Sequence, residues 1–373
     1  MNKKEISEIK KLLSPANCAI TRICGCYVDA EKNQRMKMKE AFLSLPEEVM
    51  FKYFNIFRKS LSGSINKNIM NMEFLPEQEA VGGTQEFLLK IRDSELKNDE
   101  LIEEFYERVM ETYICGGNYY IILVYGSYDI PGRASDNLDI DDASDYVYNF
   151  IQCSICPVKL SKPGLHYNSE INHMENSIPD WMVDVPDAGF LFPAFNDRNA
   201  DIHNLIYYAK NPEVLQTDFI DQLLGCSSPL SAKTQKETFQ YLIEETLGDT
   251  CDYETVMNIH EKLNELITEH KEDPEPVTLG GQEIKKLFEN SGVKNEKLAE
   301  FDAHYEALAG EETSFAATNL MDIRCNEIKT RDITVKLTPD NVQKARCRII
   351  DDVPCLVVEL TDVLELNGIE VKY

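Results

Sequence analysis

The chain has 373 residues, of which 43% are hydrophobic, 9% aromatic and 28% charged. This is enough apolar material to bury a sizeable core in two or three domains, so a disordered or low-complexity chain is excluded. The formal net charge of −27 argues against a protein that binds nucleic acid over its whole surface, because a polyanion repels phosphates.

The charge is unevenly distributed along the chain. Residues 1–67 contain 13 Lys and Arg against 7 Asp and Glu, a net charge of +6, whereas residues 68–373 contain 25 against 58, a net charge of −33. Such asymmetry is typical of a chain with one end that faces a polyanion. The alternative is an ordinary surface whose positive charge the acidic remainder neutralises.

The apolar stretches and the cysteines indicate the compartment. The longest apolar stretches, residues 119–125 and 189–195, are too short to cross a bilayer, and the N-terminal lysines surround an amphipathic segment instead of a secretion signal. Eleven cysteines, an odd number, lie mostly among apolar residues and favour reduced thiols. We therefore expect a cytoplasmic protein with no membrane partner.

Three elements are predicted in the basic first part. Ile6, Ile9 and Leu13 have the spacing of one face of a helix that ends at Ser14-Pro15. Alternating residues predict a hairpin with strands 18–28 and 35–39. A helix is then expected up to about Leu61, with Ser44 and Glu47 as its capping box.

A sheet with packed helices is predicted next. Helices are expected over residues 85–95 and 99–113, and a central strand over 119–128, followed by an acidic loop from Asp136 to Asp145. Further strands are expected at 146–155, 189–195 and 202–208. The order of these strands indicates mixed or antiparallel pairing.

The remaining chain changes character twice. After residue 211 helical patterns follow one another, at 214–224, 232–247, 253–270, 281–290 and 296–308, and beyond residue 322 short alternating strands return. We therefore predict an α+β fold with three parts: an α+β domain over 1–211, an acidic helical region over 212–321 and a small β module over 322–373.

The basic hairpin is the first candidate site. Three of its cations recur at period two and would share one face of a strand, where they could face phosphates. The alternative is a solvated edge strand that lysines protect from aggregation. The polyanion-binding residues predicted here are Lys32, Arg35, Lys37, Lys39, Lys52, Arg58 and Lys59.

A second candidate site is a pair of cysteines. Cys153 and Cys156 have a spacing at which two thiolates can share a metal ion or exchange a disulfide, and His166 and His173 could complete a zinc site. We predict no cofactor, with zinc as the alternative, and prefer two cysteines of a buried strand. No phosphate-binding glycine loop, GxSxG or HExxH motif occurs, which removes the most specific enzyme interpretations.

Four segments carry a resemblance to a known family. Residues 18–28, 42–48, 153–157 and 189–198 resemble an uncharacterised bacterial family, domain of unknown function 4317, over essentially the whole chain. The resemblance implies a bacterial, cytosolic protein and no particular activity.

The layout of the chain also resembles that of bacterial nucleoid-associated proteins. The similar features are Gly116-Gly117 before a strand, the segment 224–235 that opens a helix, and the strand 333–337 of a terminal β module. This resemblance implies association with DNA but no individual contact. The leading hypothesis is thus a non-enzymatic protein that binds DNA or another polyanion. The alternatives are a metal or redox protein using Cys153 and Cys156, and an acidic scaffold that binds a protein partner or forms a homo-oligomer.

Overall fold

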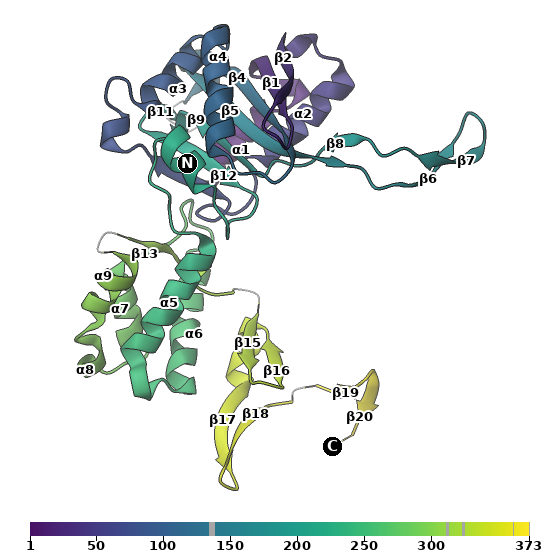
Figure 1. Cartoon of the computed structure of the whole chain (residues 1–373). Helices are drawn as coiled ribbons and strands as arrows, with labels where there is room; N and C mark the ends of the chain where they lie inside the picture. Colours follow the sequence, from purple (N-terminus) through teal and green to yellow (C-terminus); the bar gives the residue numbers. More distant parts are fainter. Residues whose placement is uncertain (134–138, 311–312, 323–324, 361, 373) are drawn as a thin grey trace. The chain divides into compact units, whose positions relative to one another are not determined.

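The computed structural model describes residues 1–133, 139–310, 313–322, 325–360 and 362–372 (Figure 1). The chain divides into two compact units, Met1–Ser231 and Ala232–Tyr373. The π-helical turn Phe219–Leu223 belongs to the first unit, because its apolar side chains are buried in that unit's core. The first unit therefore extends beyond residue 211.

One antiparallel sheet forms the centre of the first unit. Its strands are ordered β2-β1-β4-β5-β9-β12-β3, and β8 pairs with the end of β5. All of these pairs are antiparallel, in agreement with the predicted α+β class. The strands are β1 Ile20–Val28, β2 Gln34–Ala41, β3 Ile69–Glu73, β4 Asn118–Arg133, β5 Asp139–Leu160, β8 Trp181–Val183, β9 Ala188–Phe192 and β12 Asn204–Ala209.

Both faces of this sheet are covered. Ile121 and Leu123 of β4 point into one core, whereas Ile122 and Val124 point into the other. Successive side chains of a strand point to opposite faces, so a strand buried on both sides has an unbroken apolar sequence. This is the physical reason why the middle of β4 could be predicted as a central strand.

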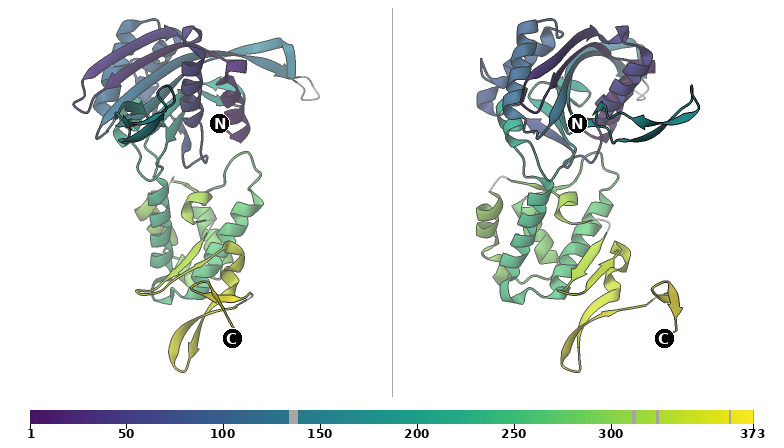
Figure 2. Two further views of the ribbon diagram at one scale, coloured as in Figure 1. Left: turned by 90° about the vertical axis from the view of Figure 1, so that its right-hand side faces the viewer. Right: turned by 45° about the vertical axis from the view of Figure 1, so that its right-hand side comes forward.

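Helices form the two outer layers (Figures 1 and 2). The helices α3, Thr84–Asp93, and α4, Asp99–Thr112, cover one face together with the π-helical turn. The helices α1, Lys3–Leu12, and α2, Glu47–Lys59, cover the other face. These four helices confirm the helical segments predicted in this part of the chain.

Three local predictions were wrong. Ser44 does not cap α2: it lies in the short 3-10 turn Phe42–Ser44 and donates to Ala41 O at 2.7 Å, while Pro46 holds the N-cap position. Residues 139–145 of the predicted acidic loop belong to β5, and Asp136 lies outside the described residues. The helix predicted over residues 214–224 is reduced to a short turn, because Asn211-Pro212 is followed by irregular chain up to residue 216.

The second unit begins with helices. Phe288 contacts Phe239 at a ring-centroid distance of 6.1 Å and Phe301 at 5.5 Å, which places aromatic side chains at the centre of the helical core. The elements are α5 Ala232–Leu247, α6 Tyr253–Glu269, α7 Gly281–Asn290, α8 Asn295–Leu298, α9 Phe301–Ala309, α10 Ala317–Leu320, and the paired strands β13 Thr278–Leu279 and β14 Phe315–Ala316.

The C-terminal strands predicted from the sequence are present as three hairpins. In the described part of this segment each strand pairs only with its own hairpin partner. Asp351 and Asp352, both with positive φ, form one two-residue turn, and Asn367 and Gly368 form another, as expected for turns that match the twist of the strands. The hairpins are β15 Asn326–Lys329 with β16 Thr334–Leu337, β17 Ala345–Ile350 with β18 Val353–Val358, and β19 Leu364–Leu366 with β20 Ile369–Val371.

Two small hairpins complete the first unit. The strands β6, Gly164–Asn168, and β7, His173–Ser177, form a ribbon that projects from the sheet (Figure 1). The strands β10, Ala194–Asn196, and β11, Asn199–Asp201, lie beside α1. Among the described residues, no helix combines the length and the apolar character that a bilayer-spanning segment requires.

Candidate anion-binding groove

The predicted row of cations on β2 is present, but each of its cations forms an ion pair with a carboxylate. Lys37 Nζ lies 2.6 Å from a carboxylate oxygen of Glu103, and Lys39 pairs with Asp99. Two residues along a strand rise about 6.8 Å and four residues along a helix about 6 Å, so two alternating lysines of β2 meet two carboxylates one turn apart on α4. The helix that covers this sheet face thus supplies the counterions of the row.

The remaining hairpin cations are also engaged. Arg35 pairs with Asp29 in the hairpin turn, and Lys32 donates to Met110 O at 2.5 Å. A backbone hydrogen bond from Asn33, together with the Arg35 guanidinium, lowers the pKa of Asp29 to about 2. This carboxylate therefore stays charged at neutral pH and neutralises the charge of Arg35.

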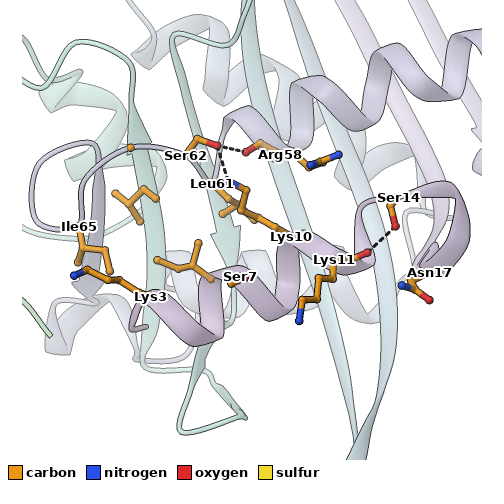
Figure 3. A pocket seen from close by; sticks show the side chains of 13 residues that line it. Lys3, Ser7, Lys10, Lys11, Ser14, Asn17, Arg58, Leu61, Ser62 and Ile65 are labelled. Carbon is orange, nitrogen blue, oxygen red and sulfur yellow. Dashed lines mark hydrogen bonds between the residues drawn. The ribbon is translucent and has the colours of Figure 1, made fainter. Parts of the chain in front are cut away.

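Helix α1 presents a second basic stripe. Lys3, Ser7, Lys10 and Lys11 lie on one side of the helix, at the three- and four-residue spacing of a single helical face (Figure 3). Ile9 packs into the core on another side. The stripe thus combines ammonium and hydroxyl groups along the length of α1.

The C-terminal end of α2 and the loop that follows it form the facing wall. Figure 3 shows Arg58, Ser62 and Ile65 across from α1, with Lys10 reaching towards Ser62. The Lys10 ammonium donates to Ser62 Oγ at 2.8 Å. Together these walls enclose a groove of about 510 Å³, lined by Lys3, Ile6, Ser7, Lys10, Lys11, Ser14, Asn17, Arg58, Leu61, Ser62, Gly63, Ile65 and Ile69.

The groove concentrates positive charge. None of its lining residues is Asp or Glu. Over the described ranges, no ion pair joins Lys10, Lys11, Arg58 or Lys59 to a carboxylate. Burial lowers the pKa of Lys10, and the neighbouring charges of Arg58 and Lys59 lower it further. Cations that repel one another in this way offer a favourable place for an anion.

The acidic residues of α1 are held away from the groove. Glu8 accepts from the Arg198 guanidinium at 2.9 Å and from the Tyr128 hydroxyl at 2.9 Å. Glu5 forms the capping box of the helix with Asn2. The contacts of Glu8 with Arg198 and Tyr128 thus help to fix the rotation of the helix, and the capping box engages the Glu5 carboxylate.

The C-terminal end of α2 is fixed by buried polar contacts. Ser60 Oγ lies 2.7 Å from Ser154 Oγ, and the Gln152 amide donates to Phe57 O at 2.8 Å. The last carbonyl groups of a helix lack partners within the helix, so the second bond satisfies one of them. Strand β5 thus positions the segment that carries Arg58 and Lys59.

The structure separates the residues predicted as a metal site. Cys153 and Cys156 are three apart on β5 and point into opposite cores. His166 and His173 lie on the projecting ribbon at least ten residues beyond Cys156, and ten residues of extended chain span roughly 33 Å. Burial raises the pKa of both thiols, which keeps them protonated. No cluster of three or more metal-ligating side chains occurs in the part of the chain that the structure describes.

The sequence-based site and the groove share only Arg58. Lys59 does not line the groove but lies close enough for its charge to lower the pKa of Lys10. Lys52 lies on the exposed side of α2. The missed signal is the polar stripe of α1, in which Lys3, Ser7 and Lys10 repeat beside Ile6 and on the side away from the buried Ile9. That stripe could be seen in the sequence, but the segment that faces it could not.

The family comparison covers nearly the entire chain. A family model described as "Domain of unknown function (DUF4317)" matches residues 1–369. This match confirms the family resemblance drawn from the sequence and does not bear on the one to nucleoid-associated proteins. No curated protein matches the chain.

Proposed function

We propose that this chain, which belongs to the DUF4317 family, is a non-enzymatic protein that binds DNA through backbone phosphates. The description of the family names no activity, so the proposal rests on the groove alone. One observation carries the proposal: Lys10, Lys11, Arg58 and Lys59 gather at the groove without carboxylate partners among the described residues. Association with the nucleoid is the setting that this proposal implies.

The chemistry of the groove fits phosphate. Ammonium and guanidinium groups form strong charge-assisted hydrogen bonds to phosphate oxygens, and a hydroxyl group such as that of Ser7 can donate a neutral one. These contacts position a backbone and do not read its bases. We therefore propose binding that depends little on DNA sequence.

The net charge of −27 does not prevent a local contact. At 0.1 M ionic strength, exposed charges more than about 10 Å apart are largely screened from one another. A phosphate in the groove is thus governed by the nearby cations. If about four phosphates are contacted, the affinity is expected to fall roughly a hundredfold between 50 and 200 mM salt.

The test compares two triple variants of the full chain that have the same net charge. Lys10→Ala, Lys11→Ala and Arg58→Ala remove cations of the groove. The variant with Arg35, Lys37 and Lys39 replaced by Ala removes the paired cations of β2. Fluorescence anisotropy with a labelled DNA duplex is expected to show at least a tenfold loss for the groove variant and a smaller salt dependence.

The β2 variant is the matched control and is expected to bind like the wild type, because its cations are already compensated by carboxylates. Equal losses in both variants would show that only net charge matters. Unchanged binding by the groove variant would refute the groove as the site.

A further inference from the structure

A single continuous arm projects from the sheet of the first unit (Figures 1 and 2). The pairing of β5 with β8 continues in the same register into β6 and β7, from Leu160 opposite Trp181 to Asn168 opposite His173. Between the two ladders, Ser161 N donates to Asp180 O at 2.8 Å. We call residues 160–182 the arm.

The outer half of the arm is amphipathic. Residues directly opposite one another in an antiparallel pair lie on the same face, so Tyr167 and Met174 share a face with Leu165. Their exposed fractions are 54%, 58% and 75%. The other face carries polar residues, among them His166 opposite Glu175. One face is therefore apolar and open to solvent in the single chain.

An exposed apolar face of this kind is expected to bind a second surface. A two-stranded ribbon is at best marginally stable in water by itself, and a protruding apolar patch is typical of an interaction surface. Within the described residues, Leu165, Tyr167 and Met174 stay more than half exposed, so no other element covers this face. A second surface is thus needed to bury its side chains.

The charge pattern favours a second copy of the chain as that partner. The outer apolar face, formed by Leu165, Tyr167, Met174 and Asn176, carries no formal charge, although the chain has a net charge of −27. A basic partner would gain more by binding the acidic surface elsewhere. Two equally acidic chains repel each other least where an uncharged surface projects from the body, as this arm does.

The apolar area of the arm is sufficient for such a contact. Six large apolar side chains that are at least half exposed lie on this face or in the loop at the tip of the arm: Leu165, Tyr167, Ile171, Met174, Ile178 and Met182. If each exposes on the order of 100 Å², they offer roughly 600 Å² in total, the share of one partner at the lower end of specific interfaces. We propose that two copies associate through the apolar faces of their arms as a symmetric homodimer, independently of the groove.

The experiment measures the mass of the full chain in solution by sedimentation velocity over a range of protein concentrations. The wild type is expected to reach twice the mass of one chain. The double variant Leu165→Glu, Tyr167→Glu places two charges on the contact and is expected to weaken dimerisation roughly a hundredfold or more.

The control variant is His173→Glu, which adds one negative charge to the opposite face of the arm and is expected to dimerise like the wild type. Circular dichroism establishes that each variant is folded, and Leu165→Ala provides a milder change of the same contact. A wild type that stays monomeric at high concentration would overturn the proposal. Equal weakening by His173→Glu and by the double variant would also overturn it.

Discussion

At the scale of the residue, Lys10 shows how the fold prepares the groove. Its ammonium is partly buried, and the nearest charges of α2, on Arg58 and Lys59, have the same sign. The hydrogen bond to Ser62 holds the side chain in place but supplies no negative charge. A residue kept in this position weakens the free protein slightly, which is common where a binding site is formed in advance of its ligand.

Replacement of Lys10 by Met tests this interpretation. Because the pKa of Lys10 is lowered in the folded chain, the unfolded chain binds more protons between the lowered pKa and the ordinary one. The destabilisation of the folded chain by the charged Lys10 side chain is therefore complete at neutral pH, and it disappears as the pH rises through that alkaline range. Lys10→Met is expected to raise the free energy of unfolding by on the order of 0.5 kcal/mol at pH 7 and low salt.

Urea unfolding at several pH values and salt concentrations measures this difference. The advantage of the variant is expected to shrink at high salt, which screens the repulsion, and to vanish near pH 10.5. A variant that is less stable than the wild type at low salt would contradict the electrostatic origin of the shift.

At the scale of the element, Gly25 sets the distance between β1 and the layer that contains α2. The ring of Tyr120, on the neighbouring strand β4, lies over Gly25, and its hydroxyl is 3.1 Å from the hydroxyl of Tyr53 on α2. A Cβ atom at position 25 would come within 2.1 Å of the Tyr120 hydroxyl oxygen. The glycine is needed for this close approach and not for its backbone freedom.

Gly25→Ala is therefore expected to displace Tyr120 and to break its contact with Tyr53. Overpacking of this kind typically costs about 1–3 kcal/mol, which a shift of the urea unfolding midpoint would show. Gly116→Ala is the matched control, because a Cβ atom there meets nothing within 4 Å. A loss of stability confined to Gly25→Ala supports the packing argument, and equal effects of the two changes would contradict it.

At the scale of the whole molecule, the two units differ in what they offer. The groove and both cores of the sheet lie in the first unit. The second unit has 16 Lys and Arg against 30 Asp and Glu, a net charge of −14. Its helices match the acidic region for which the sequence suggests a scaffold, and that alternative stays a prediction.

The separate first unit provides the last prediction. A fragment of residues 1–231 is expected to unfold cooperatively in urea, because its sheet is covered on both faces by its own helices. It is expected to bind DNA at least as tightly as the full chain at low salt, since the second unit contributes only net negative charge. Anisotropy titrations of fragment and full chain in parallel measure this, and clearly weaker binding by the fragment would place part of the site outside the groove.

Local patterns account for the parts of the structure that could be predicted. The helices α1 to α4, the first hairpin and β4 follow from spacing and turn chemistry within about 15 residues. The opposite orientation of Cys153 and Cys156 also follows once their segment is taken as a strand, because residues three apart on a strand face opposite sides. The register of the arm, which runs through Pro163 and Pro179, was not visible in any local pattern.

The sequence by itself determined the α+β class, the position of most elements, and the contrast between a basic first part and an acidic remainder. Only the tertiary structure decided which of the basic side chains lack counterions. Lys37 and Lys39 are paired by residues 66 and 60 positions later, whereas Lys10 faces Arg58 and Lys59. The physical reason is that electrostatic energy depends on distance in space, and the contacts that set this distance are made between segments far apart in the chain.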